Sequence, residues 1–202
     1  TDTFEVQTSV DFDELNAGAL LSGLDVISIA QGQTAKFLSA QVTGLTLAVN
    51  GQGDGTATFR VDVSSDAGET LDLGNATVTN ARSILNGGAG NDTIVGTNVG
   101  DTIVGGNAED VISGGEGDSR LEGGLGSDTI TGGTGSNTYV YNIDITDGFS
   151  DSAPENADQL TGFDLTKDLI EIRATGVSQF AGVEDDFLSL GKNTYEYRVL
   201  FE

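Results

Sequence analysis

A nine-residue repeat occupies the middle of this 202-residue chain and limits what the chain can fold into. Six units follow one another without a gap, from GGAGNDTIV at 87–95 to GGTGSNTYV at 132–140. Glycine stands first in every unit, an aliphatic residue or tyrosine stands eighth, and Asp, Ser or Asn stands sixth. A unit this short cannot bury an apolar face alone, so successive units must stack on one another.

Each unit divides into a six-residue Gly-rich turn and a three-residue extended piece whose eighth residue points inward. Two units make one 18-residue coil with a turn on each side. The repeat therefore predicts an all-β fold: a parallel β-roll, or β-solenoid, with two sheets, a thin aliphatic core and two rows of turns. Units two apart stack, so the sixth-place residues form two rows. The first edge carries Asp92, Asp110 and Asp128, and the second carries Asp101, Ser119 and Asn137.

Composition narrows the chemistry to oxygen ligands. The chain has no His and no Cys, which excludes Ser-His-Asp triads, thiol nucleophiles and imidazole or thiolate metal sites. With 32 acidic and 8 basic residues the net charge is −24, so nucleic acid is a poor partner and cations are good ones. Carboxylate, amide and carbonyl oxygens suit hard cations, mainly Ca²⁺. No apolar run is long enough to predict a transmembrane segment.

The spacing GGxGxDx(aliphatic)x resembles the RTX (repeats-in-toxin) calcium-binding nonapeptide, and the likeness extends from 87 to 140. The segment ADQLTGFDLTKDLIEI at 157–172 is similar to the one that commonly follows such repeats. The resemblance implies several Ca²⁺ ions between successive coils, export by type I secretion machinery and folding outside the cell. An uncleaved export signal is then expected near the carboxyl end.

The physics of the turns agrees with calcium binding. Stacked coils place equivalent carboxylates about 5 Å apart, where they repel by roughly 3 kcal/mol at an effective dielectric constant near 20. A cation removes that repulsion, so metal binding and folding become one equilibrium. We expect the first edge, with its complete acidic row, to bind calcium more tightly than the second, where Asp118 lies one place early and compensates in part.

The predicted metal-site residues are those of the second, fourth and sixth places, with Asp118 and two acids from the following segment. They are Gly88, Gly90, Asp92, Asp101, Gly106, Ala108, Asp110, Gly115, Gly117, Asp118, Gly124, Gly126, Asp128, Asn137, Asp158 and Asp168. The alternatives are a Gly-rich solenoid whose aspartates only form turns, and solvated turns at Asp158, Asp164 and Asp168. A glycosidase carboxylate pair and an ice-binding threonine array are weaker readings.

Three domains are expected: a β-rich segment at 1–86, for which a solenoid-like fold is one option, the calcium roll at 87–140, and a β-rich cap with the secretion-signal region at 141–202. Within the first, a short helix near 12–23 is possible, and VTNARSILN at 78–86 is interpreted as a cap or lead-in turn. In the last, the alternating residues of 195–202 are typical of a final strand. Bulky aromatic cores are expected in both flanks and a lean core in the middle, because no aromatic residue lies between Phe59 and Tyr139.

The sequence predicts a non-catalytic, calcium-binding part of an exported cell-surface or extracellular protein, either surface-layer or adhesin-like. Its expected partners are calcium ions, the type I secretion machinery, and further copies of itself or a cell-surface glycan or protein. The alternative is a carboxyl-terminal secretion and folding module of a secreted hydrolase or toxin.

Overall fold

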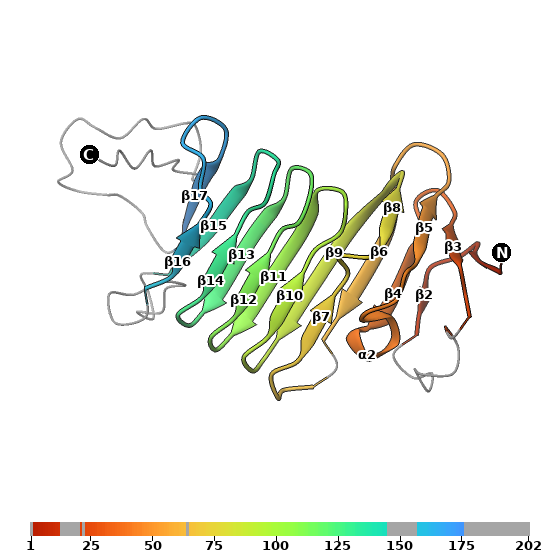
Figure 1. The fold of residues 1–202 in the computed structure, drawn as a ribbon, viewed down its shortest axis with the longest axis horizontal. Helices are drawn as coiled ribbons and strands as arrows, with labels where there is room; N and C mark the ends of the chain where they lie inside the picture. Colours follow the sequence, from red (N-terminus) through yellow and green to blue (C-terminus); the bar gives the residue numbers. More distant parts are fainter. Residues whose placement is uncertain (1, 13–20, 22, 64, 145–156, 176–202) are drawn as a thin grey trace.

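The computed structural model describes residues 2–12, 21, 23–63, 65–144 and 157–175. These residues wind into a parallel β-solenoid that runs from β1 (Thr3–Val6) at one end to β17 (Leu169–Thr175) at the other (Figure 1). Each strand pairing within the three sheets is parallel. The predicted all-β, parallel roll is therefore confirmed.

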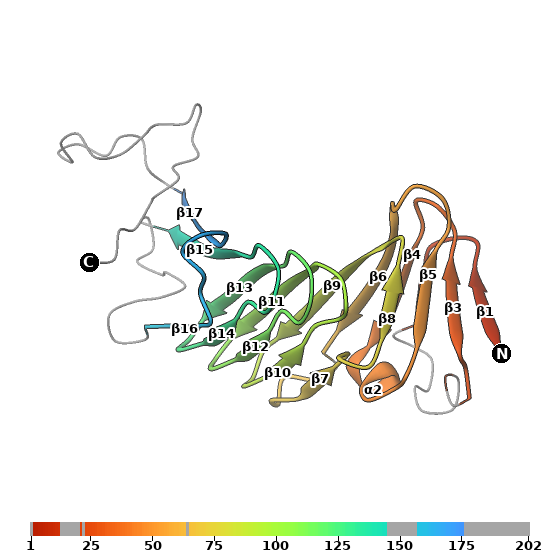
Figure 2. The same ribbon diagram turned by 45° about the horizontal axis from the view of Figure 1, so that its top comes forward.

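An eight-stranded sheet extends along the whole solenoid. Its strands are, in spatial order, β2 (Val10–Asp11), β4 (Thr34–Leu38), β6 (Ala57–Asp62), β9 (Ala81–Gly88), β11 (Asp101–Asn107), β13 (Arg120–Leu125), β15 (Thr138–Asp144) and β17. A second sheet covers its inner face over the repeats (Figure 2). The strands of that five-stranded sheet are β7 (Thr70–Asp72), β10 (Thr93–Val95), β12 (Val111–Ser113), β14 (Thr129–Thr131) and β16 (Gln159–Thr161).

Stacking follows the two-unit period. Ile94 lies opposite Ile112 in the five-stranded sheet, and Ile103 lies opposite Leu121 in the eight-stranded one. The eighth-place side chains face one another between the sheets and are buried: Ile94, Ile103, Ile112, Leu121, Ile130 and Tyr139. The three-residue strands β10, β12 and β14 thus each contribute one apolar side chain to the core, because only the middle residue of three points inward. The longer β15 buries Val140 as well as Tyr139. The Tyr139 ring packs on Phe163, with centroids 5.3 Å apart.

The N-terminal half has wider coils and a bulkier core. Successive turns of the solenoid pair Thr34 with Thr58, 24 residues apart, instead of 18. Stacked phenylalanines fill the extra width, with centroid distances of 4.7 Å for Phe12–Phe37 and 5.8 Å for Phe37–Phe59. A third sheet, in the order β1, β3 (Val26–Ile29), β5 (Ala48–Gly51) and β8 (Thr77–Thr79), encloses this core. The predicted contrast between a bulky amino-terminal core and a lean middle is confirmed.

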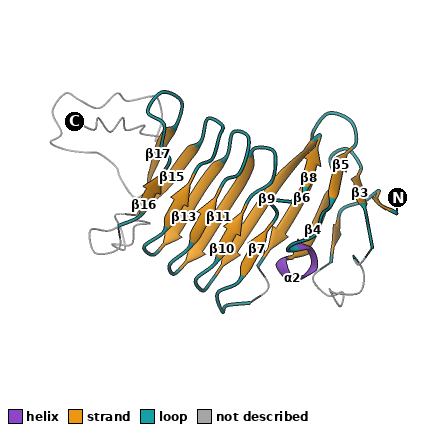
Figure 3. Cartoon of the chain, in the orientation of Figure 1, coloured by secondary structure: helices purple, strands orange, loops and turns teal. Residues whose placement is uncertain are grey.

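The wide coils meet the narrow ones at β7 and α2 (Ser39–Val42), a one-turn helix beside β4 and β7 (Figure 3). Gly44 N–H donates to Asp72 O at 3.0 Å, which stacks the end of this turn on β7. The coil that contains β6, β7 and β8 contributes one strand to each of the three sheets, and the next coil contributes to two. β9 runs from 81 to 88, so the eight-stranded sheet is continuous through residue 87. The division into three domains stays a prediction.

The interpretation of 78–86 as a cap or lead-in turn is wrong. β8 and β9 occupy this segment, and β9 pairs with both β6 and β11. Ser83 and Leu85 point inward and Arg82 and Ile84 outward, so alternation alone makes a strand here without any glycine. The possible helix near 12–23 falls almost entirely, and the strand expected at 195–202 entirely, outside the described residues. No helix in the described part of the chain has the length and apolarity needed to cross a membrane.

Candidate metal centre

A ladder of aspartates lies along the first edge, where the chain passes from the eight-stranded to the five-stranded sheet. Asp110 Oδ1 accepts the backbone N–H of Asp92 at 2.8 Å, and Asp128 Oδ1 accepts that of Asp110 at 2.8 Å. Each carboxylate thus binds the turn of the preceding coil, 18 residues earlier in sequence. The sixth-place aspartates are buried within the turns because the stacked turns on either side cover them.

The ladder extends beyond the repeats at both ends. Asp158 Oδ1 accepts the N–H of Asp128 at 3.0 Å, although 30 residues separate them. At the other end, Asp92 Oδ1 accepts the N–H of Glu69 at 2.8 Å. Five acidic residues therefore share one edge, and the predicted site residue Asp158 lies in register with the repeat aspartates.

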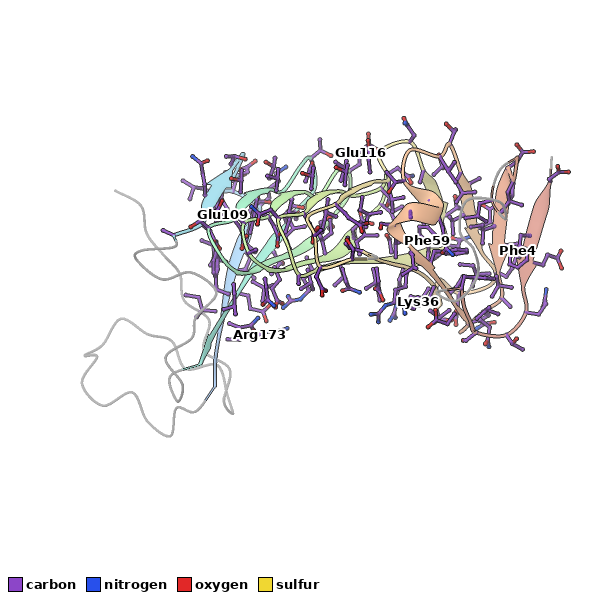
Figure 4. All side chains as sticks on the ribbon, turned by 90° about the horizontal axis from the view of Figure 1, so that it is seen from below. Phe4, Lys36, Phe59, Glu109, Glu116 and Arg173 are labelled. Atoms are coloured by element: carbon purple, nitrogen blue, oxygen red, sulfur yellow. The ribbon has the colours of Figure 1, made fainter. Side chains whose placement is uncertain are left out.

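The second oxygen of these carboxylates is where a cation fits. Asp92 and Asp110 are each 1% exposed, and the Oδ2 atom of each has no hydrogen-bond partner among the described residues. A buried carboxylate oxygen without a donor or a cation is strongly destabilised. The basic side chains Lys36, Arg120 and Arg173 pair instead with other acids: Lys36 with Asp11 and Asp62, and both arginines with Glu171. Lys36 and Arg173 project from the outer face of the eight-stranded sheet (Figure 4).

Burial also changes the acidity of these groups. Burial, helped by the charges of Asp128 and Asp92, raises the pKa of Asp110 to about 7 from its ordinary value of 3.8. Burial likewise raises the pKa of Asp92. Both shifts have the same cause: the charged form lacks an opposite charge in a desolvated place. A bound cation would supply that charge and bring the pKa down.

We therefore expect calcium-free repeats to become more stable as the pH falls from about 8 to 5. The folded state holds a proton on Asp110 that the unfolded state releases, so this stabilisation is complete below about pH 4 and is lost as the pH rises through 7. Far-ultraviolet circular dichroism in chelator across this range measures it. With calcium present the trend reverses, because protons compete with the ion for the carboxylates. The calcium concentration at which half of the protein is folded should therefore rise as the pH falls.

The control for this prediction is Asp110→Asn, which cannot ionise and has nearly the same shape. In this variant the stability of the calcium-free repeats should change much less between pH 6 and 8 than it does in the wild type. A wild-type signal that does not change with pH in chelator would contradict the raised pKa.

Backbone carbonyls are the remaining candidate ligands of the first edge. The second-place glycines Gly88, Gly106 and Gly124 have φ angles of 97°, 122° and 102°, in the left-handed region. A Cβ on Gly106 would lie 2.1 Å from Gly88 O, and one on Gly124 2.0 Å from Gly106 O. Each turn thus presents a carbonyl oxygen directly to the next, which only glycine allows.

The fourth place of the first edge has the same backbone geometry, although one of its three residues is alanine and not glycine. Gly90 and Gly126 have φ angles of 94° and 150°, and Ala108 has the same sign at 79°. Alanine in this region carries a strain of about 1 kcal/mol. No three Asp or Glu side chains in the described ranges converge on one point. Calcium takes six to eight oxygens, so carbonyls as well as carboxylates must contribute, which this donor set supports.

The second edge is built from different side chains. Asp101, Ser119 and Asn137 are buried in register, and Asp168 continues the row after β16, because Leu169 lies opposite Thr138. The glycines predicted for this edge, Gly115 and Gly117, both have a φ of 77°. Asp118 is exposed, and its Oδ1 accepts the N–H of Ser136 at 2.7 Å, so the structure does not bring it into the buried row.

Glu69 is the site residue that sequence reasoning missed. Its backbone lies in register with Asp92, since Thr70 lies opposite Thr93. Its side chain accepts a hydrogen bond from Ser39 Oγ at 2.5 Å. The signal was present, because GETLDLG at 68–74 repeats the acid–Thr–aliphatic order of NDTIVGT at 91–97. The unit escaped detection because its first, second and fourth places are Ser64, Ser65 and Ala67 and not glycine.

Comparison with known proteins agrees with this geometry. A family model described as the RTX calcium-binding nonapeptide repeat, in four copies, matches residues 79–103 and 104–139. A search among curated proteins gave no match. Residues 79–139 of this chain are therefore RTX calcium-binding nonapeptide repeats, and calcium is the ion that such repeats bind.

Proposed function

We propose that this chain is a non-catalytic, calcium-binding part of an exported cell-surface or extracellular protein, surface-layer or adhesin-like, that folds on calcium after type I secretion. The observation that carries the proposal is the buried aspartate ladder of the first edge, whose carboxylates need a cation to stack. Cytosolic calcium is too scarce to fill sites of ordinary affinity, whereas extracellular calcium is abundant. The repeats would then stay unfolded during transit and fold outside.

The amino-terminal half supports a structural role over the alternative of a folding module for a hydrolase or toxin. Strands β1 to β8 continue the same solenoid into the repeats, and the eight-stranded sheet joins both halves. One extended body with a regular surface suits assembly with further copies or contact with a cell-surface glycan or protein. Calcium-dependent self-association of the purified chain, followed by light scattering, tests this role.

Export is tested by removing residues 176–202 and expressing the chain in a host with a type I system. This deletion retains every described strand of the solenoid, so we expect the truncated chain to bind calcium normally when purified but to remain inside the cell. The matched control is Asp110→Asn with an intact tail, which should be exported and should need more calcium to fold. Normal export of the truncated chain would refute the secretion part of the proposal.

A further inference from the structure

The carboxylates of the second edge accept hydrogen bonds that the chain itself supplies, beginning at Asp101. Its Oδ2 accepts the backbone N–H of Thr97 at 2.7 Å, and its Oδ1 accepts the Thr97 hydroxyl at 2.9 Å. Both residues are buried, each with 2% exposure. Thr97 occupies the second place, where the other five units have glycine. Thr97 is thus the one residue other than glycine at the second place of the six units. Its hydroxyl donates to Asp101, the one aspartate among the sixth-place residues of this edge.

Ser119 takes the sixth place in the next turn and removes the charge. Its Oγ accepts the N–H of Asp101 at 3.1 Å and donates to Gly114 O at 3.2 Å. The same hydroxyl thus accepts the backbone N–H of the preceding coil, as a carboxylate oxygen does on the first edge, and it also donates to a carbonyl of its own turn. An aspartate here could do only the first, because a carboxylate has no hydrogen to donate.

In the last repeat turn of this edge, at 132–137, an amide and an ammonium group donate to backbone carbonyls. Asn137 Oδ1 accepts the N–H of Ser119 at 3.1 Å, which directs Nδ2 toward Gly135 O at 3.2 Å and Asp168 Oδ1 at 3.3 Å. Lys167 Nζ donates to Thr134 O at 2.6 Å in the same turn. The other oxygen of Asp168 accepts the N–H of Asp164 at 2.9 Å. Hydrogens of Asn137 and Lys167 therefore face the Gly135 and Thr134 carbonyl oxygens of this turn.

The two edges thus differ in whether the oxygens of their buried carboxylates accept hydrogen bonds from the protein. On the first edge, Asp92 and Asp110 each retain a buried oxygen with no donor among the described residues. On the second, both oxygens of Asp101 and of Asp168 accept hydrogen bonds from the protein. We infer that calcium binds along the first edge only and that the second edge is a metal-free clasp made by Thr97, Ser119, Asn137 and Lys167. This inference rests on the proposed calcium-dependent folding.

The test compares two isosteric variants, Asp110→Asn and Asp101→Asn, each changing one buried sixth-place aspartate. Bound calcium is counted by equilibrium dialysis at saturation, after circular dichroism shows that the calcium-loaded proteins are folded. We expect the first variant to bind fewer ions than wild type and the second to bind the same number. An equal loss in both variants would overturn the inference. A wild-type chain that binds no calcium would instead refute the proposed function.

A second measurement covers the case in which Asp101→Asn fails to fold. A Cβ on Gly132 would lie 2.3 Å from Tyr139 Oη and 2.6 Å from Asn137 Nδ2, so this phenol lies at the second edge. Terbium replaces calcium and emits when a nearby tyrosine transfers energy to it. We expect Tyr139→Phe to leave the emission of the terbium-loaded protein nearly unchanged. Loss of most of the emission in this variant would place an ion at the second edge and overturn the inference.

Discussion

Chelating calcium is expected to abolish the β structure of residues 87–140 while the amino-terminal coils keep theirs. The repeat tract holds eight acidic residues against one base, Arg120. Each repeat unit buries one apolar side chain, apart from the last, which buries Tyr139 and Val140. Neighbouring aspartates of the ladder repel by roughly 3 kcal/mol per pair at about 5 Å and an effective dielectric constant near 20. So thin a core cannot offset that repulsion and the entropy of ordering the chain.

Hydrogen exchange resolves this prediction along the chain. Amides of Ile94, Ile112 and Ile130 should lose protection in chelator, and those of the phenylalanine-filled coils, such as Phe37 and Phe59, should retain it. Adding calcium should restore protection in the repeats. Magnesium should do so poorly, since it requires a tighter octahedral site than these turns provide. Unchanged protection of the repeats in chelator would contradict the calcium requirement.

Replacing Gly124 by alanine is expected to lower the free energy of unfolding far more than the same replacement at Gly88, where the neighbouring coil leaves room for a Cβ. Gly124 has a φ of 102°, and a Cβ there would lie 2.0 Å from Gly106 O and 2.8 Å from its carbonyl carbon. Backbone of the adjacent coil cannot move aside without breaking the sheet. We expect a loss above about 4 kcal/mol, the range of the most damaging single substitutions.

Gly88→Ala is the matched control, at the same place of the first unit. Its φ of 97° is nearly the same, but no atom lies within 4 Å of the added Cβ. Only the left-handed strain remains, so about 1 kcal/mol should be lost. Denaturant unfolding of both variants in saturating calcium measures the difference. Similar losses would show that the coils do not stack as closely at Gly124 as the structure has them.

Several features of the site followed from the period alone. Because units two apart stack, Asp92, Asp110 and Asp128 had to share an edge, and the register confirms that pairing. The inward eighth place correctly gave the core from Ile94 to Tyr139. The segment 78–86 was misjudged because it has strand alternation without the glycines that mark the repeat, and Glu69 was missed for the same reason.

The sequence by itself determined the roll, its core and its two rows of turns, because a strict local period repeats one backbone geometry and one inward position. Only the tertiary structure decided which carboxylate oxygens are satisfied. Asp158 and Asp168 return to the two rows after an insertion of irregular length, so no period could place them. The hydroxyl of Thr97 and the amide of Asn137 close the second edge through contacts with Asp101 and Asp168. Such contacts depend on side-chain direction within stacked turns, which spacing along the chain does not specify.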